Sequence, residues 1–252
     1  MAEQKREKPP EKIKEEVQQA ARAESAPAPA RRYRALLFQG VLLLIAIAFG
    51  VLAFLVRTMP SFAIDLQITR SIQPINFPYF SLLMSLISWA GFGPQVTIIT
   101  GLIVLLIYVL GLQWEAVMAL IAAFFSTAIN VLVKDLIGRP RPAADLVNVV
   151  ARLHDYSFPS GHVMYYLGFL GFIGFLVFSL LKPSFKRSLL LVMIGMPIVL
   201  IGVSRIYLGE HWASDVLGSY LLGSLTLVAT IQFYRWGKTR FFVHQPVAAG
   251  PQ

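Results

Sequence analysis

Apolar residues in this chain gather into six long runs separated by shorter polar stretches. Each run approaches the roughly 20 residues that a helix needs to cross about 30 Å of hydrocarbon. A helix also satisfies its backbone hydrogen bonds internally, as lipid requires. The pattern therefore predicts an all-α, polytopic membrane protein built as a bundle of six transmembrane helices. The predicted spans are residues 35–56, 94–111, 115–135, 161–181, 187–204 and 214–234.

The segment between the first two spans, residues 57–93, departs from this pattern. Polar residues such as Asp65 and Arg70 lie among apolar ones, and a shorter apolar run from Phe77 to Ala90 follows. This mixture predicts amphipathic helices that lie at the membrane interface or are partly re-entrant. A seventh span is the alternative interpretation.

The two ends of the chain lie outside the apolar pattern. Residues 1–34 are rich in Glu, Lys, Ala and Pro and bury too little apolar surface to fold alone, so we expect a disordered tail. The first apolar run begins too late, and is too long, for the apolar region of a signal peptide. We expect one membrane domain over residues 35–236 and a C-terminal tail over residues 237–252.

Composition supports a membrane location. The chain is 56% hydrophobic and only 14% charged, whereas soluble domains are roughly 25% charged. The net charge of +9 favours contact with anionic membrane phospholipid, and no basic face interleaved with aromatic residues indicates nucleic-acid binding. Cysteine is absent, which excludes disulfides and thiolate metal sites. Nothing in the pattern indicates an oligomeric state.

Basic residues determine the predicted orientation, because cytoplasmic loops are enriched in Lys and Arg. Three basic clusters fall on one side of the predicted topology. Both termini are therefore expected in the cytoplasm, and the segments 57–93, 136–160 and 205–213 on the outer face. The compact chain favours a bacterial inner membrane, with these segments facing the periplasm. The clusters are Arg31, Arg32 and Arg34; Lys182, Lys186 and Arg187; and Arg235, Lys238 and Arg240.

Three polar segments are predicted to lie at that outer face: residues 134–142, 159–162 and 204–215. Singly, each has a simpler explanation, because basic residues at span ends often extend to the lipid head groups and Pro-Ser-Gly is a common turn. Together they supply three cations, two histidines and a carboxylate in a region where ionisable residues are rare. The combination predicts a functional site.

The cations and a helix start in these segments predict that the site binds phosphate. Lys134, Arg141 and Arg205 provide fixed positive charge, and an arginine can pair with two phosphate oxygens at once. Ser160 and Gly161 begin a span, so their backbone N–H groups and the helix dipole are expected to face an anion. A phosphoryl transition state is stabilised by such fixed charge.

The two histidines are predicted to have different roles in the reaction. His211 and Asp215 are four residues apart, so they share a face if this stretch is helical. A carboxylate on one ring nitrogen leaves the other nitrogen free to attack phosphorus. His162, beside the phosphate site, is expected to protonate the leaving alkoxide and then to activate the water that hydrolyses the phosphohistidine.

A zinc site formed by His162, His211 and Asp215 is the chemical alternative. Three nearby cations would repel a divalent ion and no cluster of carboxylates offsets them, so we expect a reaction that uses neither metal nor cofactor. Two acidic residues close to the motifs carry weaker predictions. Glu210 is expected to be solvated, and Asp155 is expected either to contact the head group or to have no role.

The three segments together resemble the type 2 phosphatidic acid phosphatase family. The pattern K-x6-R-P lies in residues 134–142, P-S-G-H in 159–162 and S-R-x5-H-x3-D in 204–215. The spacing of the first motif assigns the phosphate to Arg141 rather than to the nearby Arg139.

This resemblance implies a six-helix bundle with an outward-facing site, metal-independent hydrolysis and the histidine roles described above. It also implies a lipid substrate such as phosphatidic acid, phosphatidylglycerol phosphate, a polyprenyl diphosphate or a lipid A phosphate. The alternatives are a transferase that passes the phosphoryl group to another lipid through the same intermediate, and a non-enzymatic lipid transporter. A haloperoxidase is disfavoured, because lipid-length spans lie on both sides of the motifs.

Overall fold

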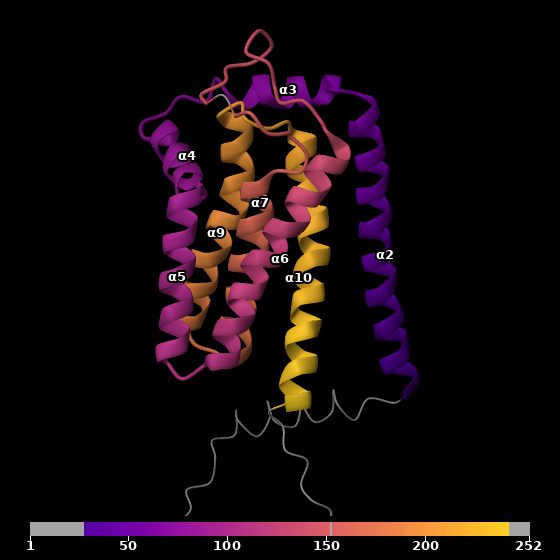
Figure 1. Cartoon of the computed structure of the whole chain (residues 1–252), viewed down its shortest axis with the longest axis vertical. Helices are drawn as coiled ribbons and strands as arrows, with labels where there is room; N and C mark the ends of the chain where they lie inside the picture. The colour runs from indigo at the N-terminus through magenta and orange to yellow at the C-terminus, as the bar shows by residue number, and fades with distance from the viewer. Residues whose placement is uncertain (1–27, 152, 242–252) are drawn as a thin grey trace, which may run out of the picture. The chain divides into compact units, whose positions relative to one another are not determined.

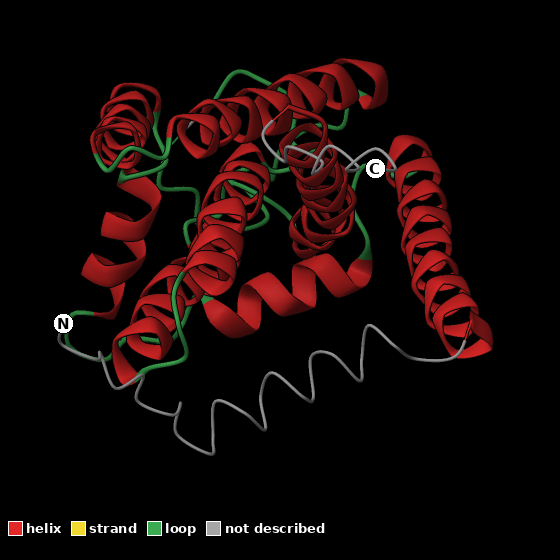
Figure 2. Cartoon of the chain, turned by 90° about the horizontal axis from the view of Figure 1, so that it is seen from below, coloured by secondary structure: helices red, strands yellow, loops and turns green. Residues whose placement is uncertain are grey.

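The computed structural model describes residues 28–151 and 153–241, which form helices joined by loops, without a β-strand (Figure 2). The predicted all-α, polytopic class is confirmed. Most of both predicted tails lies outside the described residues. Where the tails are described, residues 28–34 and 237–241 belong to long helices, so these helices extend beyond the predicted boundaries.

The helices follow one another along the chain as drawn in Figure 1. Residues up to Leu44 and residues from Ile45 onward form two separate compact units. The second unit carries all three polar segments. The elements are α2 (Ala28–Thr58), α3 (Ala63–Ile72), α4 (Phe80–Trp89), α5 (Gly93–Val109), α6 (Gln113–Ile137), α7 (Gly161–Tyr165), the π-helical turn η1 (Tyr166–Leu170), α8 (Gly171–Leu180), α9 (Phe185–Tyr207) and α10 (Ala213–Phe241).

Five helices are long and apolar enough to cross a bilayer, and a bent pair supplies a sixth candidate. The predicted span at 94–111 corresponds to α5, which reaches that length only together with α4, across a bend of 72°. Gly91 and Gly93 flank the break, and Pro94 has no N–H group with which to continue a helix from α4. The mixed segment before it forms two short helices, α3 and α4. The five single helices are Arg32–Thr58, Gln113–Ile137, Gly161–Leu180, Phe185–Tyr207 and Ala213–Phe241.

The continuous helix from Gly161 to Leu180 is central to the second unit, because it contacts α6, α9 and α10. Its buried Val163 and Phe169 belong to one apolar core with Met118 of α6 and Ile201 of α9. Close packing around this helix holds the surrounding helices in a defined register, and so it also sets the positions of the side chains at their ends.

All three polar segments lie at one end of the second unit. There α6 ends at Ile137 and α7 begins at Gly161, while α9 ends at Tyr207 and α10 begins at Ala213. In Figure 1 the connecting loops and the short helix α3, which lies across the others, form the upper end of this unit.

At the opposite end of this unit, a charged cluster joins α6 to α10. Glu115 Oε1 accepts a hydrogen bond from the Tyr234 hydroxyl at 2.9 Å and pairs with Lys238 Nζ at 2.5 Å. The basic residues Lys182 and Lys186 lie in or next to the connection between α8 and α9 at this same end. Lys182, Lys186 and Lys238 therefore lie at the end away from the polar segments.

Candidate active site

A cavity of about 340 Å³ lies among the three polar segments. All three predicted cations, Lys134, Arg141 and Arg205, line the cavity, and so do the predicted histidines His162 and His211. The structure thus brings these five residues together, although they belong to three helices and two loops.

Lys134 and Arg141 are held by the same acidic side chain. Arg141 Nη2 pairs with Asp155 Oδ1 at 2.6 Å, and Lys134 Nζ pairs with Asp155 Oδ2. Arg141 Nη1 donates to the Glu210 carbonyl oxygen at 2.7 Å and lies 3.2 Å from His211 Nε2. Both cations are therefore fixed on the side of the cavity that His211 occupies.

Arg205 is completely buried and paired with Glu210. Arg205 Nη2 contacts Glu210 Oε2, and Nη1 donates to Ser88 Oγ of α4. Burial raises the pKa of Glu210, and the charge of Arg205 opposes that rise. The prediction of a solvated Glu210 is wrong, because only 3% of this residue is exposed. Glu210 and Asp155 each pair with a cation of the site, so two separate carboxylates partly offset its positive charge.

His211 lies in the loop before α10, so the helical arrangement considered for it and Asp215 is wrong. Asp215 is in the first turn of α10, and its Oδ2 still lies 3.6 Å from His211 Nδ1. Ser157 Oγ lies 3.5 Å from the same nitrogen and donates to Asp215 Oδ2. Burial and the charges of Arg141 and Arg205 lower the pKa of His211 well below its ordinary value. The imidazole is therefore neutral near pH 7, with Nδ1 toward the carboxylate and Nε2 toward Arg141.

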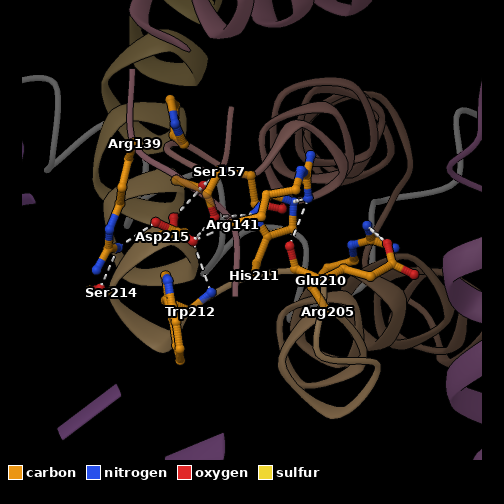
Figure 3. Close-up of polar contacts among 12 residues, drawn as sticks. Arg139, Arg141, Ser157, Arg205, Glu210, His211, Trp212, Ser214 and Asp215 are labelled. Carbon is orange, nitrogen blue, oxygen red and sulfur yellow. Dashed lines mark hydrogen bonds and ion pairs between the residues drawn. The ribbon is translucent and has the colours of Figure 1, made fainter. Parts of the chain in front are cut away.

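A buried charged network holds Asp215 from its other side (Figure 3). Arg139 Nη1 pairs with Asp215 Oδ1 at 2.5 Å, as Figure 3 shows. Arg139 Nη2 pairs with Asp65 Oδ2 of α3 at 2.8 Å. Asp65 also accepts hydrogen bonds from the backbone N–H and the hydroxyl of Ser214, at 2.8 and 2.7 Å. The side chains of Arg139 and both carboxylates have no exposed area. Arg139 is thus directed into this network, whereas Arg141 lines the cavity.

His162, the second residue of α7, lies against the break between α4 and α5. His162 Nε2 lies 3.1 Å from the Ser88 carbonyl oxygen, and its ring meets the Phe92 ring edge to face with centroids 4.9 Å apart. A Cβ atom at Gly91 would lie 2.2 Å from His162 Cδ2, so the ring fits only because residue 91 is glycine. The bent α4–α5 pair therefore sets the orientation of His162.

The start of α7 differs from the prediction, because one of the two backbone N–H groups expected to face an anion is already engaged. Ser160 is fully buried, and its backbone N–H donates to Ser219 Oγ of α10 at 2.6 Å, so this group is not free to bind an anion. Gly161 and His162 line the cavity instead. Their N–H groups lie in the first turn of α7, where no carbonyl of the same helix can accept from them.

The family of this chain is decided by a match between residues 114–238 and the model of the PAP2 superfamily. The matched stretch contains all three polar segments. The chain belongs to the PAP2 superfamily. The resemblance inferred from the motifs is confirmed, and the chain is a membrane lipid phosphatase of this superfamily.

One relative of this PAP2 protein matches most of its length, and a second matches about a third of it. It is 29% identical over 181 residues to phosphatidylglycerophosphatase B of Bacillus subtilis (strain 168), which covers 70% of this chain and 86% of the relative. It is 35% identical over 83 residues to an undecaprenyl-diphosphatase of Sulfolobus acidocaldarius, a match over 33% of this chain and 36% of the relative.

Solved structures show the same fold. The crystal structure of the first transmembrane PAP2 type phosphatidylglycerolphosphate phosphatase from Bacillus subtilis matches with a TM-score of 0.68 and 26% identity, over 80% of this chain and 98% of that one. The crystal structure of Aquifex aeolicus LpxE matches with a TM-score of 0.56 and 22% identity, over 69% and 98% of the two chains, and this likeness concerns the fold alone.

Several residues that shape the PAP2 site were not predicted from the sequence. A carboxylate among apolar residues was the only signal for Asp65. Nothing in the sequence marks Ser88, Ser157 or Ser219, because a serine near a span end is common. Their roles follow from contacts between segments that are more than 50 residues apart.

Within the described part of this PAP2 chain, no group of three or more His, Asp or Glu side chains is arranged to hold a metal ion. His162, His211 and Asp215 are not gathered into such a group among the described residues. Hydrogen bonds and ion pairs from Ser157 and Arg139 already engage the two carboxylate oxygens of Asp215.

Arg205→Lys is expected to weaken phosphate binding. Arg205 uses two nitrogens on Ser88 and Glu210 in the cavity wall, and a single ammonium group cannot reproduce that fork. We expect the inhibition constant of vanadate and the KM for the lipid to rise roughly tenfold. Arg70→Lys is the matched control, because Arg70 is exposed and, among the described residues, donates only to the Leu146 carbonyl. An unchanged vanadate constant in Arg205→Lys would contradict a role in phosphate binding.

Proposed function

We propose that this chain hydrolyses a lipid phosphomonoester or diphosphate at the outer membrane face, without a metal ion, through a phosphohistidine on His211. The position of His211 carries the proposal. Its Nδ1 faces Asp215, and its Nε2 lies 3.2 Å from Arg141 at the cavity. A neutral imidazole held in this way has its free electron pair on Nε2, the atom that can attack phosphorus.

Three cations bind the phosphoryl group in this proposal. Lys134, Arg141 and Arg205 contact its oxygens from the cavity wall, and the N–H groups of Gly161 and His162 at the start of α7 add further donors. Such donors stabilise the charge that spreads over the phosphoryl oxygens in the transition state, and they need no reorganisation because they are already fixed.

In the first step a P–N bond forms as a P–O bond breaks. His211 Nε2 attacks phosphorus opposite the oxygen that belongs to the lipid, and Asp215 with Ser157 stabilises the positive charge on the imidazole. His162, in its protonated form, donates a proton to the leaving oxygen, and the Ser88 carbonyl oxygen, 3.1 Å from His162 Nε2, helps to orient the ring. A phosphomonoester therefore leaves as the lipid hydroxyl, and a diphosphate leaves as the lipid monophosphate.

In the second step water replaces the histidine. His162, now neutral, accepts a proton from a water molecule whose oxygen attacks phosphorus. The P–N bond breaks, inorganic phosphate forms, and His211 returns to its neutral state. Two histidines are therefore needed, one to carry the phosphoryl group and one to move the proton.

The proposed orientation places the site at the periplasmic face of a bacterial inner membrane, with both termini in the cytoplasm. The basic residues Lys182, Lys186 and Arg187 support it, because they lie at the end of the bundle away from the cavity. Two of the similar proteins come from Bacillus subtilis. We also propose residues 35–236 as the membrane domain, with tails on either side.

Phosphatidylglycerol phosphate is the substrate that we propose to test first. The Bacillus subtilis relative and the Bacillus subtilis crystal structure are both named for its dephosphorylation, and each is matched over most of its own length. Undecaprenyl diphosphate comes second, because the match to the undecaprenyl-diphosphatase covers a smaller part of both chains. Phosphatidic acid and lipid A phosphate complete the panel.

The test is phosphate release by the purified full-length protein in detergent, with strong chelator present, from each lipid of the panel. We expect one or two lipids to release phosphate at rates that the chelator does not change. A transferase would release little phosphate until a second lipid is added as acceptor. A transporter would bind lipid without turnover. Activity that disappears in chelator and returns with a divalent ion would contradict the metal-free reaction.

A further inference from the structure

Asp155 pairs with both cations on one side of the proposed phosphate site. Its Oδ1 lies 2.6 Å from Arg141 Nη2, and its Oδ2 contacts Lys134 Nζ. Each carboxylate oxygen thus takes one cation, as two oxygens of a bound phosphate would. Arg141 and Lys134 have side chains that are only 12% and 10% exposed, whereas the Asp155 side chain is 56% exposed.

Glu210, the carboxylate that pairs with Arg205, differs from Asp155 in its exposure to solvent. Glu210 pairs with Arg205, and both side chains are buried, at 2% and 0% exposure. Separating that pair would leave an unpaired charge inside the protein, which is costly. Asp155 instead lies on a loop, its side chain contacts no other residue in the described part of the chain, and it can move into water with little loss of burial.

Asp155 is negatively charged whenever the site works. The neighbouring charges of Lys134 and Arg141 outweigh the effect of burial and lower the pKa of Asp155 to about 2. An ionised carboxylate and a phosphate repel each other, and they cannot both accept from the same N–H groups. A phosphate that takes the same N–H groups on both cations therefore displaces Asp155.

We propose that Asp155 is an internal competitor of phosphate, which binds Lys134 and Arg141 between turnovers, is displaced by the lipid phosphate, and returns to help expel inorganic phosphate. This inference rests on the proposed function, because it takes Lys134 and Arg141 as phosphate-binding residues. It makes Asp155 a residue that sets affinity for substrate and product.

The test is Asp155→Asn in the full-length protein, with inorganic vanadate as the probe of the phosphate site. The amide keeps the size of the side chain and removes its charge. We expect the inhibition constants of vanadate and of inorganic phosphate to fall roughly tenfold, since a competing charge is lost. Asp155→Glu keeps a carboxylate and is expected to restore values close to those of the unchanged protein.

Asp145→Asn is the matched control. Asp145 lies in the same loop region, is exposed, and its side chain has no partner among the described residues. The control removes the same charge, so a change that both variants share would come from net charge alone and would contradict the proposal.

The sign of the effect separates competition from a structural role. A residue that only holds the two cations in place would, when lost, weaken vanadate binding and raise its inhibition constant. An unchanged or raised constant in Asp155→Asn, with Tm as in the unchanged protein, would overturn the inference. If Asp155→Asn is poorly folded, Asp155→Ser serves for the same measurement.

Failure of the proposed function gives a different result. In that case the unchanged protein releases no phosphate from any lipid and vanadate does not raise its Tm, and both proposals fall together. If the unchanged protein is active and inhibited by vanadate, only the role of Asp155 is in question.

Discussion

His211→Ala is expected to lower phosphate release by at least about a thousandfold, because no other group at the cavity is placed to attack phosphorus. Its Nε2 lies beside Arg141, and its Nδ1 is held near Asp215 and Ser157. Loss of the nucleophile removes the covalent step, and the remaining cations can only bind the substrate. Vanadate should therefore still raise the Tm of the variant.

Two measurements check this expectation. Initial rates are compared with those of His154→Ala, a matched control because His154 is exposed and does not line the cavity. Rapid quenching with a lipid that carries labelled phosphate should leave label on the unchanged protein and on the control but not on His211→Ala. Label that persists in His211→Ala would show that another residue forms the intermediate.

Arg139→Met is expected to destabilise the protein by about 3–5 kcal/mol, because it leaves Asp65 and Asp215 buried without their shared cation. Arg139 pairs with both carboxylates at 2.8 and 2.5 Å, and none of the three side chains is exposed. The loss should appear as a lower Tm in detergent. Adding Asp65→Asn removes one of the two unpaired charges and should recover part of the Tm.

Arg141→Met is the matched control, since the same substitution is made only two residues away. Arg141 lines the cavity, and its side chain is 12% exposed, so its loss should weaken vanadate binding and turnover with little change in Tm. The opposite outcome, with Arg139→Met stable and unable to bind vanadate, would reverse the assignment of the two arginines.

The membrane spans could be predicted from the sequence because lipid acts locally on each segment. A long apolar run must be helical to satisfy its backbone, whatever the rest of the chain does. Residues 57–93 were harder, since the short runs there are too apolar for loops and too short for spans. Whether α4 continues into α5 depends on the break at Gly91 and on the contacts of α4 with α9.

The site was predictable in part for a related reason. The residues in its motifs lie at the ends of spans, so connectivity alone predicted that they share one membrane face. Their individual contacts were not predictable. Ser160 was expected to offer a free N–H group, but Ser219, which lies 59 positions later in the chain, accepts from it. Glu210 was expected in water, but Arg205 holds it in the interior.

By itself, the sequence determined the helical class, the membrane location and the set of chemical groups at one end of the bundle. These depend on hydrophobicity along short segments and on motifs whose members are close in the chain. Only the tertiary structure decided which cation each carboxylate pairs with. Arg139 and Arg141 have the same chemistry and each precedes a proline, yet one meets Asp65 and Asp215 in the interior and the other meets Asp155 at the cavity. A buried charge is stable only with a partner, and here the partners come from distant segments of the chain. A local sequence pattern therefore cannot predict which residues pair.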